Sequence, residues 1–304
     1  MYDVMVEEAN LWFDETSQRQ RKVVDNSPPS PALVYEDSDD DEVDPVAEEK
    51  YRRQVMESGG FDVDLFIQPF GGIVPIGCTA YQKLFGKVGL HCYNIDKGTN
   101  LLFKTVKKVN GEIGSLFNFY ITLEAMDPVN NSLVTFQTCV THAVSHSEAS
   151  LRIFTKACRI KPLVPGTGNQ VSRWDPDAVD EYYKGDLPNW LEDDDALTAA
   201  DKLHLSEVKE WELLDNKWLY LYAEFALFSV WSSDLSDYLP FEMKKVVVRT
   251  KEGVASSEKL KASNAIFYMS FKPRGGPECR GIIRQTRDGR AEHMCLEARC
   301  WIDK

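Results

Sequence analysis

Apolar and polar residues alternate along several stretches of the first half of the chain, and this pattern predicts β-strands. In FNFYITLEA (117–125) every odd-numbered residue is apolar and most even-numbered ones are polar, which gives a strand one apolar face. LLFKTVKKV (101–109), TFQTCVTHAV (135–144) and LRIFTKACRI (151–160) predict three further strands. FDVDLFI (61–67) shows the same alternation and predicts another.

Helical spacing predicts two helices in the same half. DPVAEEKYRRQVMES (44–58) opens on Asp-Pro, places acidic residues before basic ones, and is followed by a glycine pair that can end it. YQKLFGKVGLHCYN (81–94) carries apolar residues at helical spacing. Gly86 and Gly89 each cost up to about 1 kcal/mol inside a helix, so we expect this helix to lie tightly on another element.

The second half weakly repeats the first. FYMSFKP (267–273) resembles FYITLEA (119–125), and RCWI (299–302) partly matches ACRI (157–160). The echo favours two similar sheets, the second completed by LYLYAEFALFSV, MKKVVVRT and RGIIRQT. We therefore predict an α+β fold with two antiparallel sheets, the first wrapped on one helix.

The composition suggests how these elements are divided along the chain. Residues 1–47, rich in proline and acidic residues, predict a disordered tail. We expect one sheet domain at 48–165 and a second at 201–304. The segment 166–200, rich in Pro, Gly and Asp, predicts a linker or surface connection packed by its tryptophans.

The net charge of −13 belongs to the tail and not to the sheets. Residues 1–49 hold 15 acidic and 3 basic residues, which leaves 48 − 15 = 33 acidic and 35 − 3 = 32 basic residues elsewhere. A nearly neutral body gives no electrostatic basis for direct nucleic-acid binding. The N-terminus lacks the pattern of a signal peptide and the longest apolar run is too short for a membrane span. We expect no membrane association and a nuclear or cytoplasmic location.

Candidate chemistry is sparse. The seven cysteines are scattered without a CxxC pair, which favours free thiols. Cys139 and His142 are three apart on a predicted strand, so they point to opposite faces and a dyad is improbable. The acidic run 192–195 lacks the spacing of a calcium loop and is most simply a solvated helix start. We expect no catalytic, metal or cofactor site.

The tail contains three candidate phosphorylation sites. Ser27 and Ser30 precede prolines, and Ser38 precedes three aspartates. Proline-directed and acid-directed kinases favour these patterns. A solvated tail with no specific role is at least as common an explanation.

LFGKVGLHCYN, followed by a strand, a corner and FYITLEA, resembles plant cystatins. Taken together, GFDVD, YNIDKGTN, FYITLEA, TFQ, LPNW and AIFYM are similar to a plant, largely crucifer, cystatin/monellin-like family that includes the male-sterility-five proteins. The resemblance covers residues 48–304. It implies cystatin-like sheets and a possible role in pollen development or male meiosis.

The cystatin resemblance also implies where an inhibitory surface would lie. The QxVxG loop of inhibitory cystatins falls on Glu112, Ile113, Gly114, Ser115 and Leu116, with glutamate in place of glutamine and leucine in place of the final glycine. Gly59 and Gly60 match the N-terminal inhibitory element, and the Pro-Trp of the second hairpin is absent. Leu116 should obstruct insertion into a narrow protease cleft.

Two functions are therefore compared. The first is a non-catalytic protein that binds protein partners of unknown identity, with the sheets as a docking platform. The alternative is a cysteine-protease inhibitor that uses a degenerate first hairpin loop. The sequence leaves open the oligomeric state and whether the two halves share one core.

Overall fold

A computed structural model describes residues 44–64, 72–114, 116–143, 150–166, 171–191, 199–231, 234–253 and 256–303. These residues belong to one compact unit, residues 43–304. The predicted tail, apart from its last four residues, lies outside the described residues. The strands are β1 (Ile73–Pro75), β2 (Leu102–Ile113), β3 (Phe117–Asp127), β4 (Ser132–Ala143), β5 (Ser150–Ile160), β6 (Leu205–Glu207), β7 (Glu242–Arg249), β8 (Ala265–Lys272), β9 (Cys279–Thr286) and β10 (Met294–Ile302).

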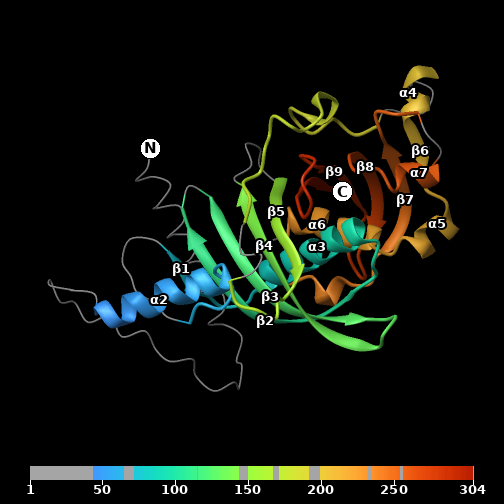
Figure 1. Cartoon of the computed structure of the whole chain (residues 1–304). Helices are drawn as coiled ribbons and strands as arrows, with labels where there is room; N and C mark the ends of the chain where they lie inside the picture. Colours follow the sequence, from blue (N-terminus) through green and yellow to red (C-terminus); the bar gives the residue numbers. More distant parts are fainter. Residues whose placement is uncertain are drawn as a thin grey trace. The chain divides into compact units, whose positions relative to one another are not determined.

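The helices are fewer and mostly short (Figure 1). The predicted helices at 44–58 and 81–94 are confirmed as α2 and α3. In α2, Asp44 accepts a hydrogen bond from the N–H of Val46, and Gly59 ends the helix with a φ of 65°. The helices are α2 (Pro45–Ser58), α3 (Ala80–Lys97), α4 (Ala199–His204), α5 (Glu210–Asp215), α6 (Leu219–Phe228) and α7 (Ser256–Lys259), with 3₁₀ turns at Glu181–Tyr183 and Ser236–Tyr238.

All ten strands form one sheet, so the prediction of two separate sheets is wrong. The order is β1-β2-β3-β4-β5-β10-β9-β8-β7-β6. β5 and β10 pair antiparallel from Met294↔Thr155 to Arg299↔Ser150. The last strand of each half thereby satisfies the backbone groups of the other, and neither is left as an open edge.

The two halves of the sheet repeat each other in register, which confirms the weak sequence echo. Across the first half, a row of paired residues runs Val109, Ile121, Thr138, Cys158. The corresponding row in the second half runs Val246, Met269, Gly281, Cys300. Each half is thus a helix followed by a four-stranded antiparallel meander, and the two halves are joined through the last strand of each.

One irregularity of the ladder repeats as well. On β2 the pairing shifts between Val106 and Lys108, and on β7 it shifts at the equivalent place, between Met243 and Lys245. Each shift leaves one lysine, Lys107 or Lys244, as the extra residue of a bulge. The repeat therefore extends to details that the sequence pattern alone does not reveal.

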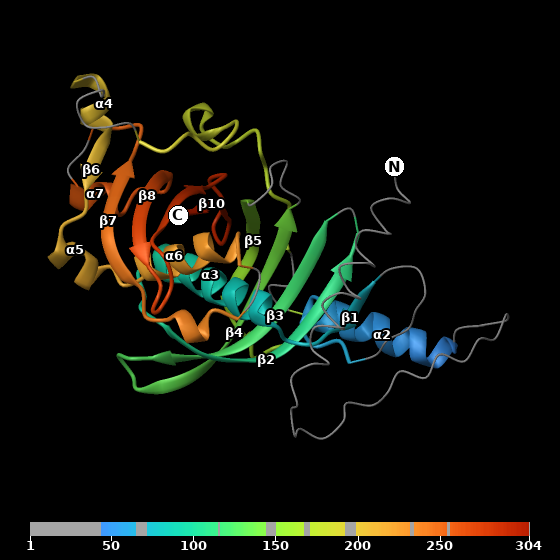
Figure 2. The ribbon, with the colours of Figure 1, turned by 180° about the vertical axis from the view of Figure 1, so that it is seen from behind.

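The helices α3 and α6 cover the same face of the sheet, here called the helix face (Figures 1 and 2). The prediction that LYLYAEFALFSV supplies a strand is wrong, because most of it forms α6. Seven of the ten residues of α6 are buried. Apart from Glu224, this helix is apolar or aromatic around its whole circumference, which suits a largely enclosed position and gives no helical periodicity from which to predict it.

A single hydrophobic core joins the halves on the helix face. It contains Phe85 and Ile121 from the first half and Phe225 and Met269 from the second, together with residues of β5 and β10. Lys87 of α3 donates to Glu224 of α6 at 2.7 Å. The question left open by the sequence is thus answered, since both halves share one core.

The opposite face, here called the outer face, is covered by other parts of the chain. Phe61 and Val63, which follow α2, pack with Tyr120. The strand predicted at 61–67 is wrong for residues 61–64, which form a turn followed by irregular backbone, and the remainder lies outside the described residues. Trp174 packs on Phe154 and Trp190 on Tyr268, so the tryptophans fasten residues 171–191 to the sheet as predicted.

In the described part of the chain, no helix has both the length and the apolar character needed to cross a bilayer. All seven cysteines are free, and only Cys78 is exposed. Cys139 lies in the cluster on the outer face while His142 contacts Tyr81 of α3. The prediction that these two residues face apart is confirmed.

Candidate functional site

The predicted inhibitor-loop positions lie at the turn between β2 and β3. Ile113 pairs with Phe117, so Gly114 and Leu116 lie in a short turn, and Ser115 between them lies outside the described residues. Leu116 is 38% exposed. Glu112 accepts hydrogen bonds from Asn118 at 2.9 Å and from the hydroxyl of Tyr120 at 2.8 Å. Its carboxylate is therefore bound back onto the sheet.

The predicted N-terminal inhibitory glycines lie on the outer face, near the same tyrosine. The carbonyl of Gly60 accepts a hydrogen bond from Asn110 at 2.7 Å. Its φ is 93°, and a Cβ here would stand 2.6 Å from Ile73 and 3.0 Å from the Tyr120 ring. Burial, with Cys139 and Glu112 adding to it, raises the pKa of Tyr120. Gly60 is thus held by packing at a buried position.

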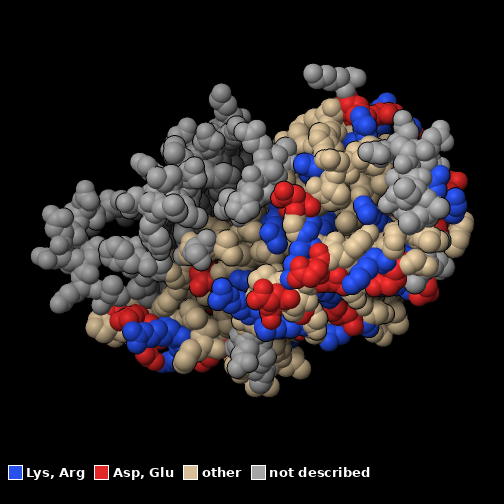
Figure 3. All heavy atoms as spheres, turned by 90° about the horizontal axis from the view of Figure 1, so that it is seen from above, with Lys and Arg blue, Asp and Glu red and all other residues tan. Residues whose placement is uncertain are grey.

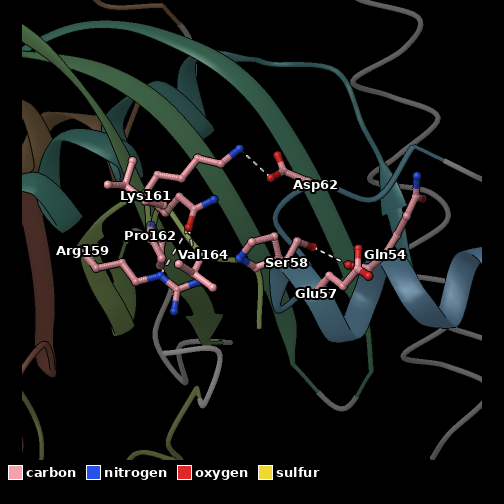
Figure 4. A pocket seen from close by; sticks show the side chains of 11 residues that line it. Gln54, Glu57, Ser58, Asp62, Arg159, Lys161, Pro162 and Val164 are labelled. Carbon is pink, nitrogen blue, oxygen red and sulfur yellow. Dashed lines mark hydrogen bonds and ion pairs between the residues drawn. The ribbon is translucent and has the colours of Figure 1, made fainter. Parts of the chain in front are cut away.

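A groove opens between the end of α2 and the end of β5 (Figure 4). Its volume is about 250 Å³. On one rim Lys161 donates to Asp62 at 2.7 Å, and on the floor Arg159 donates to the buried Gln137. Beyond β5 the chain turns through KPLVP, where Leu163 is 100% exposed and Val164 60%.

A second polar cluster joins residues that are far apart in the sequence. The hydroxyl of Ser172 lies 2.7 Å from Nε2 of His293, and Nδ1 of the same ring lies 2.7 Å from Oδ2 of Asp288. The side chains of His293 and Asp288 are fully buried, whereas Ser172 is exposed. Burial acts to raise the pKa of Asp288, but hydrogen bonds from His293 and two backbone N–H groups outweigh it and leave that pKa lowered.

Sequence reasoning missed this cluster for a structural reason. Ser172 lies in the segment interpreted as a linker, and the other two residues lie in the β9–β10 connection. No spacing rule joins them, because the contact exists only once residues 171–180 lie on the sheet. The one local signal was an Asp and a His in the same short connection, with His293 directly before β10 and Asp288 five residues earlier.

The structure bears on only part of the remaining candidates. The serines 27, 30 and 38 and the acidic run 192–195 lie outside the described residues. Among the residues whose placement is described, no cluster of three His, Cys, Asp or Glu side chains has the arrangement of a metal site.

The fold defines an α+β protein with one antiparallel sheet built from two similar halves. The Protein MS5 family profile matches residues 187–296. One UPF0725 protein of Arabidopsis thaliana is 44% identical over 276 residues, covering 86% of this chain and 77% of that protein. Another is 40% identical over 275 residues, covering 88% and 94%. The chain therefore belongs to this plant family, the MS5 or UPF0725 proteins, as the sequence resemblance indicated.

A solved structure shares the fold. The crystal structure of MS5 from Brassica napus matches with a TM-score of 0.59 and 24% identity, over 75% of this chain and 100% of that one. At this identity the match bears on the fold alone.

Proposed function

We propose that the protein binds protein partners, and that the groove between α2 and β5, with the adjoining KPLVP turn, is the docking site. The main support for this proposal is that the side chains of Leu163 and Val164 are exposed beside the groove. Neighbouring exposed apolar side chains next to a concave surface are typical of interaction sites. Prolines on both sides of the pair restrict the turn, which lowers the entropy lost on binding.

The chemistry of the groove indicates the kind of partner. Lys161 and Asp62 form an ion pair at the rim, so the groove presents no single charge to steer a charged ligand. Figure 3 likewise shows positive and negative side chains interspersed over the face it displays. We therefore expect a peptide segment that places an apolar side chain on Leu163 and Val164 and offers backbone groups to the polar rim.

Family membership supports a more specific role. The male-sterility-five resemblance supports action in pollen development or male meiosis, in the nucleus or the cytoplasm. This part of the proposal rests on family analogy, because a fold does not by itself fix a function.

The test is affinity capture from flower buds with the full chain as bait. Substituting Leu163→Ser together with Val164→Ser should reduce recovery of a specific partner at least about tenfold, as expected when about 1.4 kcal/mol or more of binding energy is lost. Leu214→Ser is the matched control, because Leu214 is 66% exposed on α5. Equal recovery with all three baits would refute the groove as the docking site.

The competing function, cysteine-protease inhibition, is tested separately with papain. Because Leu116 occupies the turn and Glu112 is bound to Tyr120, we expect no inhibition at micromolar protein. Micromolar or tighter inhibition that is lost on substitution of residues 113–116 would favour the inhibitor instead.

A further inference from the structure

The geometry points to a second activity, in which Ser172 is a nucleophile, activated by His293 and Asp288, that accepts an acyl group from a carboxylic ester. This inference goes beyond the proposed binding role and uses a different part of the molecule. Two hydrogen bonds of 2.7 Å link the three side chains in the order hydroxyl, imidazole, carboxylate. This is the arrangement by which a histidine activates a serine.

The direction of each hydrogen bond follows from the chemistry of the groups. An ionised carboxylate can only accept, so Nδ1 of His293 donates to Asp288. Nε2 of a neutral imidazole then carries the lone pair and accepts the hydroxyl proton of Ser172. A neutral ring with these two partners therefore has the tautomer that a general base requires.

The base is held firmly. The N–H groups of Asp175 and Arg290 both donate to Asp288, at 3.0 and 3.1 Å. Trp174 stacks on the imidazole with ring centroids 6.1 Å apart. A fixed imidazole and carboxylate favour proton transfer because little reorganisation is needed.

The loop that carries His293 is strained beside the site. Glu292 has a φ of 67°, which is unfavourable for a residue with a side chain. Its N–H donates to Asp96 at 2.6 Å, its carbonyl accepts from Thr155 at 2.8 Å, and its carboxylate accepts from the N–H of Cys158 at 3.1 Å. These anchors fix the backbone where His293 begins.

The substrate side of the cluster is open, because Ser172 is exposed while its partners are buried. Within the part of the chain that is described, the backbone N–H of Arg173 has no acceptor. The N–H of the residue after a nucleophile is a common donor to the oxyanion of acyl transfer. Arg290 donates to the carbonyl of Arg173 at 2.8 Å and helps to position it.

The reaction consists of two steps. In the first, Oγ of Ser172 bonds to the ester carbonyl carbon and its proton passes to Nε2 of His293. The carbon–oxygen bond to the alcohol then breaks, and the alcohol leaves with that proton, which gives an acyl-serine and a neutral imidazole. In the second, water adds to the acyl carbon through the same base, and the products are a carboxylic acid and free Ser172.

The experiment treats the full chain with a fluorophosphonate, in which a serine oxygen displaces fluoride from phosphorus, and locates the adduct by peptide mass spectrometry. We expect one adduct, on Ser172. With p-nitrophenyl acetate, Ser172→Ala should lower p-nitrophenol release about 100-fold or more, and Asp288→Asn more than about tenfold. Ser236→Ala is the matched control, because Ser236 is an exposed serine that bonds to Asp234, and it should leave the rate unchanged.

The adduct is located on the unmodified chain, so the result does not depend on whether any variant folds. If the protein takes up no fluorophosphonate, or takes it up equally when Ser172 is alanine, the three side chains serve only to pin residues 171–180 to the sheet and the inference is overturned. Release of p-nitrophenol that is unchanged in Ser172→Ala overturns it as well. The groove variants Leu163→Ser and Val164→Ser should leave both readouts unaffected, which separates this test from that of partner binding.

Discussion

In each half of the sheet a helix lies in close contact with the equivalent row of paired residues. In one half the helix supplies the small residue at this contact, and in the other half the strand supplies it. In the first half the helix supplies Gly89, where a Cβ would stand 2.1 Å from Oγ1 of Thr138. In the second half the strand supplies Gly281, where a Cβ would stand 2.8 Å from that of Ala226. Thr138 and Gly281 occupy equivalent positions in the ladder.

The difference shows that the close approach is the shared feature, and the residue that permits it is not. Because Gly89 and Ala226 occupy equivalent positions, the other residues of α3 and α6 can be matched to each other at the same separation in the sequence. Lys87 corresponds to Glu224, so the ion pair joins equivalent positions. His91 corresponds to Phe228, so one half buries an ionisable ring where the other buries an apolar one.

The largest expected effect comes from removing the small residue in the first half. Gly89→Ala should lower the free energy of unfolding by about 3 kcal/mol, because overpacking of a buried contact exceeds the roughly 1 kcal/mol gained in helix propensity. Urea unfolding followed by circular dichroism measures the change. Adding Thr138→Gly recreates the arrangement of the second half and should restore most of the loss. No restoration in the double variant would contradict the equivalence.

The second prediction concerns the buried ring of the first half. Burial, with Arg287 adding to it, lowers the pKa of His91 to about 3, so the ring stays neutral in the folded protein. In the unfolded chain this histidine has its ordinary pKa of about 6.5 and binds a proton below that pH. The contribution of the neutral ring to the free energy of unfolding is therefore complete above pH 6.5 and is lost as the pH falls towards 3. Between pH 6.5 and 5 we expect a loss of about 2 kcal/mol from this ring.

Substitution with the residue of the other half tests that prediction. His91→Phe should keep the stacking on Trp218, whose ring centroid lies 5.0 Å away, and flatten the dependence of unfolding free energy on pH. Burial also lowers the pKa of His142, so part of the slope remains in the variant. An unchanged slope would show that His91 gains a proton without opposing folding.

The third prediction concerns the contact in the second half of the sheet, where the glycine lies on the strand and the alanine on the helix. Gly281→Ala should destabilise the protein by about 1 to 2 kcal/mol, because the new Cβ meets Ala226 on a packed helix. Ala226→Gly should relieve the contact in the double variant, at the cost of a glycine within α6. Thermal unfolding of the four proteins gives the coupling. Additive effects of the two substitutions would contradict direct contact.

The smallest effect is expected at the ion pair between the helices. The side chains of Lys87 and Glu224 are 28% and 15% exposed, so Lys87→Met should cost about 1 kcal/mol, less at high salt. Lys83 and Asp234 provide the control, because they lie 3.9 Å apart and are mostly exposed. Lys83→Met should change the unfolding free energy by less than about 0.5 kcal/mol. Equal costs for the two would show that burial adds nothing.

The local pattern of apolar and polar residues predicted those helices and strands that have one apolar face and one more polar face. The strands β2 to β5 and the helix α3 have distinct apolar faces, so their periodicity was visible in the sequence, and Gly86 and Gly89 foretold the tight contact with the sheet. The helix α6 is largely enclosed and has no such periodicity. The pairing of β5 with β10 depends on residues about 140 positions apart, which no local pattern encodes.

The candidate sites divide in the same way. The turn that holds Glu112 and Leu116 lies between two predicted strands, so the position of the turn was visible in the sequence, whereas the assignment of an inhibitory loop came from the cystatin resemblance. The contact of Ser172 with His293 depends on where residues 171–180 cross the outer face, and the groove depends on how α2 packs. Both are products of tertiary structure.

The margins of the sheet have a consequence for assembly. Both outermost strands are only three residues long, and β1 ends in Pro75, which lacks an N–H. The two outermost strands are alike. If one of them paired with a strand of a second molecule, the other could do the same, and the molecules would form a fibre. Within the described residues, the short outermost strands and the bulges that carry Lys107 and Lys244 interrupt the border of the sheet, which opposes such growth.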